Sequence, residues 1–228
     1  MSTTLITSAL SVLAISMVSF ATFLKIFKTK DRNVNDLSFA LCWLNVSLIF
    51  LLIGVRMTVF FYGSEEAARI VAYIIQTVLV FIFINFGYYI FYLESKKKFI
   101  NKFLFGVVVL SGLCFFLFLI KDGIVGPMVS EWGTEYTASM SANIFLFIAG
   151  GLGILAIIFS LIKQSYVFVV KKEINKERFF KMLSLLLFVA FGTLEQIGNV
   201  GWHVLFFRIL ILSSALTAYS VYVFQEKI

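Results

Sequence analysis

Proline, histidine and cysteine are the residues that this chain contains least of, and each scarcity excludes a class of protein. The 228 residues include one proline, one histidine and two cysteines. A single histidine, His203, excludes a haem held by two histidines and a metal centre built on several. Cys42 and Cys114 lie inside apolar runs at different depths, so we expect no disulfide between them.

Catalytic motifs are also missing. The apolar runs contain no serine–histidine or paired-aspartate arrangement of the kind that a membrane hydrolase needs. Neither a glycine-rich phosphate loop nor a dinucleotide-binding fingerprint occurs. We therefore expect a protein that is not an enzyme and that uses no metal or cofactor.

Apolar residues are what the chain has in excess. They make up 61% of the sequence, including 28 phenylalanines, and the mean hydropathy is +1.01. A transmembrane helix needs about 20 consecutive apolar residues, and seven such runs fill almost the whole chain. The sequence predicts an all-α fold, an integral membrane bundle of seven transmembrane helices that forms one domain over residues 1–228. The predicted helices cover residues 5–27, 37–62, 67–92, 100–120, 142–169, 179–197 and 202–224.

One connection is longer than the others, residues 121–139. It is rich in glycine and contains the only proline, Pro127, together with Trp132 and Tyr136. We expect an irregular loop on the outer side of the membrane.

Lysine and arginine are distributed unevenly between the two ends of the predicted helices. Of 19 basic residues, only Arg56, Arg69, Lys121 and Arg208 belong to the side that holds the N-terminus. Because basic residues accumulate on cytoplasmic loops, we expect a multi-pass protein of the cell membrane with its N-terminus outside and its C-terminus in the cytoplasm. The net charge of +7 then reflects topology and contact with lipid headgroups, and we expect no nucleic-acid partner. The other 15 basic residues are Lys25, Lys28, Lys30, Arg32, Lys96, Lys97, Lys98, Lys102, Lys163, Lys171, Lys172, Lys176, Arg178, Lys181 and Lys227.

An acid and a base flank the shortest connection, residues 198–201. Glu195 lies about one turn before it and Arg208 about two turns after it, roughly 8–10 Å inside each helix at ~1.5 Å rise per residue. Charged residues at such depth are costly unless they pair or serve a site. Either the two form a structural ion pair that fixes the register of the last two helices, or they are one wall of a polar pocket open to the outside.

Further polar residues are expected near the outer ends of the second, third, sixth and seventh predicted helices. A lone arginine there can snorkel to the headgroups, whereas several that converge indicate a hydrated cavity. Arginine outnumbers glutamate in this set, and guanidinium groups bind carboxylates and phosphates, so such a cavity favours a small anionic or zwitterionic ligand. The candidate ligand-binding residues are Arg56, Arg69, Gln76, Glu195, Asn199, His203 and Arg208. For His203, beside Trp202, a place in the interfacial aromatic belt and a role as a pH sensor are both open.

Three segments carry a resemblance to a known family. The longer outer connection contains GPMVSEWGTEYTAS, the basic segment that enters the sixth helix reads KKEINKERFFKMLSLLLF, and the last helix ends in LTAYSVYVF. In this pattern the whole chain resembles the seven-helix sensor module at the N-terminus of some bacterial and archaeal histidine kinases. The resemblance implies a sensory receptor whose signal, without a kinase segment, passes to a partner.

A second resemblance is to the microbial rhodopsins. In the run ARIVAYIIQTVLV, Arg69 and Thr77 match the third helix of that family, but Ala72 stands at the proton-acceptor position. In ILSSALTAY the position of the retinal-binding lysine is Leu216 and that of the counter-ion is Leu212. The resemblance implies a relative that has lost its chromophore, because Leu216 excludes a retinal Schiff base.

Three functions therefore remain open. The leading hypothesis is a receptor-like or sensory membrane protein that binds a small ligand in its outer half and signals through the sixth and seventh helices. A transporter or channel for a small solute or ion is the rival, although only Asn45, Asn85 and Gln164 supply polar groups in the inner half. The third is an accessory membrane subunit that docks through the outer connection.

Overall fold

The computed structural model describes residues 3–29, 33–93, 98–171, 175–196 and 201–225. These residues form seven α-helices, one short π-helical segment and one two-stranded sheet. The helices are α1 (Thr3–Lys28), α2 (Val34–Phe61), α3 (Glu65–Gly87), α4 (Lys98–Asp122), α5 (Met140–Lys171), α6 (Lys176–Glu195) and α7 (Trp202–Gln225), with the π-helix η1 (Tyr88–Leu93) after α3. The strands are β1 (Ile124–Ser130) and β2 (Gly133–Ala138).

The predicted all-α character is confirmed. Six of the described helices, all but α6, are long and apolar enough to cross a membrane. The exception is due to charge, because Arg178, Lys181 and Glu195 lie near the two ends of α6. Two of these side chains, Lys181 and Glu195, are buried and form ion pairs with residues of other helices.

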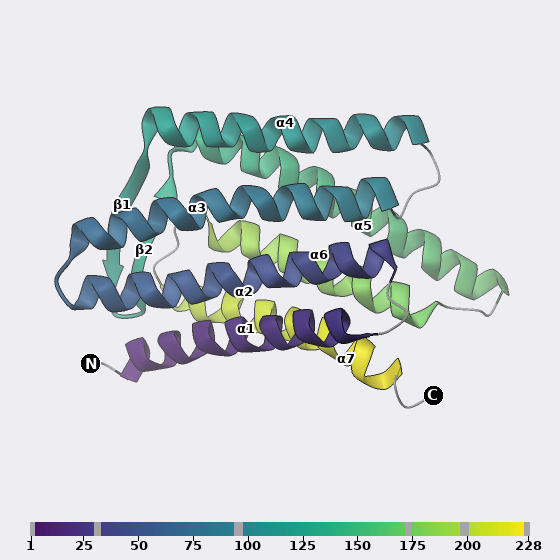
Figure 1. Ribbon diagram of the computed structural model, residues 1–228, viewed down its shortest axis with the longest axis horizontal. Helices are drawn as coiled ribbons and strands as arrows, with labels where there is room; N and C mark the ends of the chain where they lie inside the picture. The colour runs from purple at the N-terminus through teal and green to yellow at the C-terminus, as the bar shows by residue number, and fades with distance from the viewer. Residues whose placement is uncertain (1–2, 30–32, 94–97, 172–174, 197–200, 226–228) are drawn as a thin grey trace.

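The helices lie side by side along the long axis of the molecule (Figure 1). Each helix packs against the next in chain order, and α7 packs against α1, so the seven helices close into a ring. The first residues of α1 lie at the end of the bundle that carries the sheet, and α7 finishes at the opposite end. The ring order brings α7 beside α1, far from its position in the sequence.

Local signals explain where several helices begin. The Asn33 side chain accepts a hydrogen bond from the Asp36 amide at 3.0 Å, and the Asp36 carboxylate accepts one from the Asn33 amide at 3.2 Å. This reciprocal capping box satisfies donors that the first turn of α2 leaves open. Ser64 and Asn175 cap α3 and α6 in the same position.

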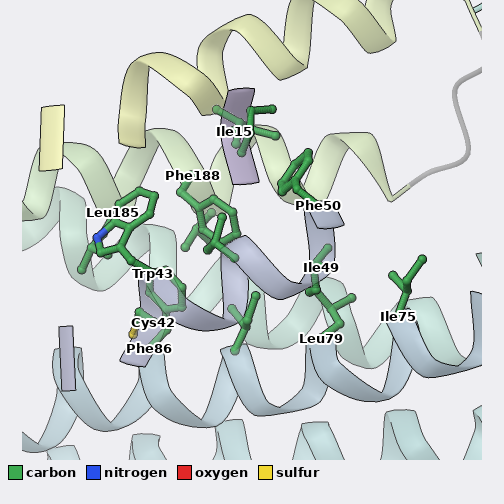
Figure 2. Close-up of a cluster of buried hydrophobic side chains, with 14 of the residues drawn as sticks. Ile15, Cys42, Trp43, Ile49, Phe50, Ile75, Leu79, Phe86, Leu185 and Phe188 are labelled. Carbon is green, nitrogen blue, oxygen red and sulfur yellow. The ribbon is translucent and has the colours of Figure 1, made fainter. Parts of the chain in front are cut away.

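Aromatic and branched side chains fill the centre of the ring (Figure 2). The rings of Phe86 and Phe188 stack at 5.3 Å, and Trp43 meets Phe188 edge to face at 6.0 Å. Cys42 is buried beside them, Cys114 is partly buried in α4, and both are free thiols. This layer separates the two ends of the bundle with apolar surface.

The expected irregular loop over residues 121–139 is instead largely a β-hairpin. β1 and β2 pair antiparallel through the tight turn at Glu131 and Trp132, and the register shifts between Val125 and Met128, around Pro127. β-branched and aromatic residues such as Val125, Val129 and Tyr136 favour the strands. The hairpin crosses one end of the bundle from α4 and α5 towards α1 and α2 (Figure 1).

Candidate functional site

Arg208 lies at the centre of the polar residues at the end of the bundle that carries the hairpin, the end expected from the sequence to face outside. Its Nε donates to Glu195 Oε1 at 2.8 Å, its Nη2 donates to Glu135 Oε1 at 2.9 Å, and its Nη1 donates to Ser8 Oγ. The side chain is 1% exposed. It therefore joins α7 to α6, to the hairpin and to α1. Of the two alternatives left open for Glu195 and Arg208, the structure contains the ion pair.

Arg56 reaches the same carboxylate from the other side. Its Nη2 donates to Glu135 Oε2 at 2.8 Å and to the carbonyl oxygen of Thr134 at 2.6 Å. Its guanidinium carbon lies 5.6 Å from the centre of the Tyr136 ring. The two oxygens of Glu135 are thus held by arginines from two different helices, α2 and α7.

We name Arg56, Glu135, Glu195 and Arg208 the outer ionic cluster. Its two guanidinium groups and two carboxylates sum to no net charge, whereas the sequence prediction counted arginines against Glu195 alone. Taking one member away leaves an unpaired buried charge, which costs about 3–5 kcal/mol. The four side chains therefore depend on one another.

Gln76 extends the polar layer to α3. Its Nε2 donates to Gln196 Oε1 at 3.1 Å, and the Gln196 carbonyl oxygen accepts from Thr137 Oγ1 of the hairpin at 2.8 Å. Gln76 is buried, and within the described residues its Oε1 has no hydrogen-bond partner. The hairpin is therefore attached to α6 by a backbone contact in addition to the arginine contacts.

The remaining predicted site residues lie elsewhere. Arg69 is exposed on α3, and in the part of the chain that the structure describes no ion pair connects it to the outer ionic cluster. His203 is exposed at the start of α7 with its ring 4.7 Å from that of Trp202. Asn199 lies outside the described residues. The structure thus brings together Arg56, Glu195 and Arg208, with Gln76 nearby.

A small apolar cavity adjoins the cluster. It has a volume of about 40 Å³ and lies between α2, α3, α5 and α6. Branched and aromatic side chains such as Ile49, Ile82 and Phe188 line it, while Thr193, Glu195 and Gln196 line its outer end. This space is large enough for a few atoms of an apolar group next to a buried carboxylate.

A second group of buried charges lies at the opposite end of the same helices. Lys181 Nζ donates to Asp36 Oδ1 at 2.7 Å and also to Glu177 Oε1, and the Tyr222 hydroxyl donates to Asp36 Oδ1 at 3.0 Å. Lys181 Nζ lies 4.8 Å from the centre of the Tyr222 ring and 5.7 Å from that of Phe39. We name Asp36, Glu177, Lys181 and Tyr222 the inner ionic cluster.

Sequence reasoning missed Glu135 and Lys181 for different reasons. Glu135 lies in the segment expected to be an irregular loop, although the alternating GTEYTA run was a usable strand signal. Lys181 was counted as one of the basic residues that set topology. Its position five residues into α6, opposite the capping aspartate of α2, only becomes evident once helices α2 and α6 are placed.

No family model, curated protein or solved structure matches this chain. The two resemblances therefore rest on sequence patterns alone. Leu216, which the rhodopsin resemblance aligns with the retinal lysine, is 48% exposed.

Proposed function

We propose that the chain is a receptor-like, sensory membrane protein with seven spans, its N-terminus outside and its C-terminus in the cytoplasm. In this proposal a small carboxylate ligand enters from outside and takes the place of Glu135 between Arg56 and Arg208. The observation that carries the proposal is the bridging position of Glu135, whose two oxygens contact arginines of two helices. Glu135 belongs to the hairpin and not to the helical ring, so it can be exchanged without unfolding a helix.

The exchange is favourable in charge. The buried arginines need carboxylates at all times because an unpaired guanidinium in this environment is costly. A ligand carboxylate offers the same two oxygens, one for each arginine, and the released Glu135 gains water. Glu135 then acts as an internal competitor that holds the site closed when no ligand is present.

The adjoining cavity limits the size of the ligand. Its volume of about 40 Å³ and its apolar lining next to Glu195 suit a short hydrocarbon group. A short-chain carboxylate such as propionate combines this group with the anion that the arginines bind. The proposed ligand class is therefore a small carboxylate with an apolar end.

Transmission follows from the way three helices connect the two clusters. α2 carries Asp36 and Arg56, α6 carries Lys181 and Glu195, and α7 carries Tyr222 together with Arg208. When the carboxylate at the outer cluster is exchanged, α6 and α7 shift relative to α2, and the inner cluster rearranges. Such a rearrangement at the cytoplasmic end is the signal offered to a partner, a two-state change of the kind that helix shifts produce.

The apolar layer between the clusters favours signalling over transport. Trp43, Phe86 and Phe188 meet face to face and edge to face in the centre of the ring. An ion or polar solute that crossed here would lose its hydration against apolar surface, at a cost of several kcal/mol or more. We therefore rank the transporter hypothesis below the receptor.

Calorimetric titration with propionate tests the binding step. The full chain is reconstituted in phosphatidylcholine nanodiscs, and the dissociation constant for propionate is compared with those of Glu135→Gln and Arg56→Gln. Glu135→Gln removes the competitor and leaves one uncompensated arginine, so propionate is expected to bind about tenfold more tightly. Arg56→Gln is expected to abolish binding, and Glu66→Gln, an exposed glutamate at the start of α3, is the matched control.

The outcome that contradicts the proposal is equally specific. If neither the unaltered chain nor Glu135→Gln binds propionate at about 10 mM, ten times a millimolar dissociation constant, the arginine pair is purely structural. Size-exclusion profiles and circular dichroism of each variant exclude misfolding as the cause.

Spin labels test the transmission step separately. Labels at Phe180→Cys on α6 and Phe103→Cys on α4, both exposed, report the inner end of the bundle once Cys42 and Cys114 are replaced by alanine. Propionate is expected to change their separation by roughly 1–5 Å, the range of helix shifts in switching proteins. If propionate binds without a change in the distance between the two labels, the chain has a ligand site but does not transmit a signal in the proposed way.

A further inference from the structure

A polar cavity lies between the last part of α5 and the first turn of α6, at the end of the bundle opposite the hairpin. Its volume is about 170 Å³. It is distinct from the apolar cavity beside Glu195 and from both ionic clusters. The residues that line it are Ser160, Lys163, Gln164, Val167, Asn175 and Arg178.

The lining favours an anion. Lys163 from α5 and Arg178 from α6 contribute two cations, and none of the lining residues is acidic. Asn175 caps α6 here, with its Oδ1 accepting from the Arg178 amide at 2.9 Å. The positive end of the α6 dipole therefore adds to the two cations.

Gln164 is the observation that turns this cavity into a candidate site. Both polar atoms of its amide are buried, and neither has a hydrogen-bond partner among the described residues. Buried amides without partners are unfavourable. A ligand oxygen in the cavity would supply the acceptor that the amide nitrogen lacks.

We propose that this cavity binds a phosphate group, held by Lys163, Arg178 and the Gln164 amide. A tetrahedral phosphate monoester presents three oxygens to donors that come from two helices, and arginine and lysine bind it by charge-assisted hydrogen bonds. The proposal is independent of the carboxylate ligand at the outer cluster.

The source of the phosphate is either a lipid headgroup or a soluble ion. Exposed apolar side chains flank the cavity on α5, namely Phe159 (70% exposed), Ile162 (62%) and Tyr166 (68%). In a membrane this surface lies against acyl chains, so an anionic lipid places its headgroup at the height of the cavity. A free phosphate ion reaches the same donors from the water.

The test uses the full chain in phosphatidylcholine nanodiscs, with two probes. Dioctanoyl phosphatidic acid carries the phosphate monoester on a lipid, and inorganic phosphate carries it alone. Binding is measured by titration calorimetry for the unaltered chain, for Arg178→Gln and for Gln164→Leu. Lys102→Gln, which removes a basic residue near the start of α4 outside the cavity, is the matched control for general surface charge.

Arg178→Gln is expected to weaken binding about tenfold or more, because a charge-assisted hydrogen bond to phosphate is lost. Gln164→Leu leaves the charges unchanged and removes an unsatisfied amide, so it is expected to fold at least as well and to bind several-fold more weakly.

The two probes distinguish the sources of the phosphate. Binding of phosphatidic acid alone identifies a lipid site, and binding of inorganic phosphate alone identifies a soluble ligand. Binding of both shows that the phosphate group itself is recognised, and each of these three outcomes supports the proposal. Binding of neither probe overturns it, as does an equal loss in Lys102→Gln.

Discussion

The two ionic clusters use the same three helices but hold their carboxylates in different ways. In the inner cluster Asp36 is part of α2 and of its capping box, and Glu177 is one turn from Lys181 on α6. In the outer cluster Glu135 comes from the hairpin and reaches two helices at once. The inner contact between Lys181 and Asp36 joins side chains of two helices, so a change in it is linked to movement of those helices, whereas the outer contact can be replaced by another carboxylate. This difference makes the outer end suitable for sensing and the inner end for response.

The largest effect is expected from Arg208→Met, because it breaks the outer cluster at its centre. Glu195 and Glu135 lose a common partner while Glu195 stays buried, so the free energy of unfolding should fall by about 3–5 kcal/mol. Titration of mixed micelles with SDS, followed by circular dichroism, measures this loss. Arg69→Met removes an exposed arginine at the same end and should change stability by less than about 0.5 kcal/mol. Equal losses in the two variants would show that Arg208 is not held as described.

Lys181→Met breaks the inner cluster and should cost less. Glu177 is 41% exposed and can turn to water. The main loss is therefore that Asp36 no longer has a basic partner. The expected loss is about 2–3 kcal/mol in the same titration. Lys102→Met, near the start of α4, is the control at the same end of the bundle. A loss as large as that of Arg208→Met would contradict the ranking of the two ends.

Tyr222→Phe separates the hydrogen bond to Asp36 from the packing of the ring. The ring and its contact with Lys181 remain, and only the hydroxyl that donates to Asp36 Oδ1 is lost. Stability should fall by about 1–2 kcal/mol, with Tyr219→Phe, a partly buried tyrosine one turn earlier, as the control. No measurable change would mean that α7 is joined to α2 by packing alone.

Thr137→Val is expected to have the smallest effect, and it tests how the hairpin is attached to the end of α6. It removes the hydrogen bond from Thr137 Oγ1 to the Gln196 carbonyl oxygen and keeps the branched shape. The expected loss is about 1 kcal/mol, and Thr58→Val, which breaks only a local bond within α2, is the control. A loss above that of Lys181→Met would show that the hairpin is held mainly by its backbone contacts and not by Glu135.

The sequence predicted the helices because long apolar runs leave little choice of structure in a membrane. It also predicted that Glu195 and Arg208 meet, since a short turn places them at matching depth on neighbouring helices. Glu135 could not be placed in the same way, because it approaches Arg56 and Arg208 only after a hairpin folds across the end of the ring. Lys181 is buried because α6 packs against α2. The sequence around Lys181 contains no pattern that predicts this packing.

The same limit explains the remaining site residues. Arg69 and Gln76 both lie on α3, yet one is exposed and the other is buried. Seven residues are nearly two turns of helix, so the two side chains lie on nearly the same face of α3. Arg69 lies near the start of the helix, whereas Gln76 lies deeper and donates to Gln196 at the end of α6. The shared face could be predicted from the spacing, but which part of that face other elements cover could not.

Rescue of Glu135→Ala by acetate shows whether the arginine pair accepts a free carboxylate. The midpoint of thermal unfolding in nanodiscs is measured for Glu135→Ala in sodium chloride and in sodium acetate of equal ionic strength, beside Asp36→Ala of the inner cluster. We expect acetate to restore at least half of the stability lost in Glu135→Ala and little of that lost in Asp36→Ala, where the capping box of α2 is missing as well. An unfolding midpoint of Glu135→Ala that is the same in chloride and acetate would contradict this expectation.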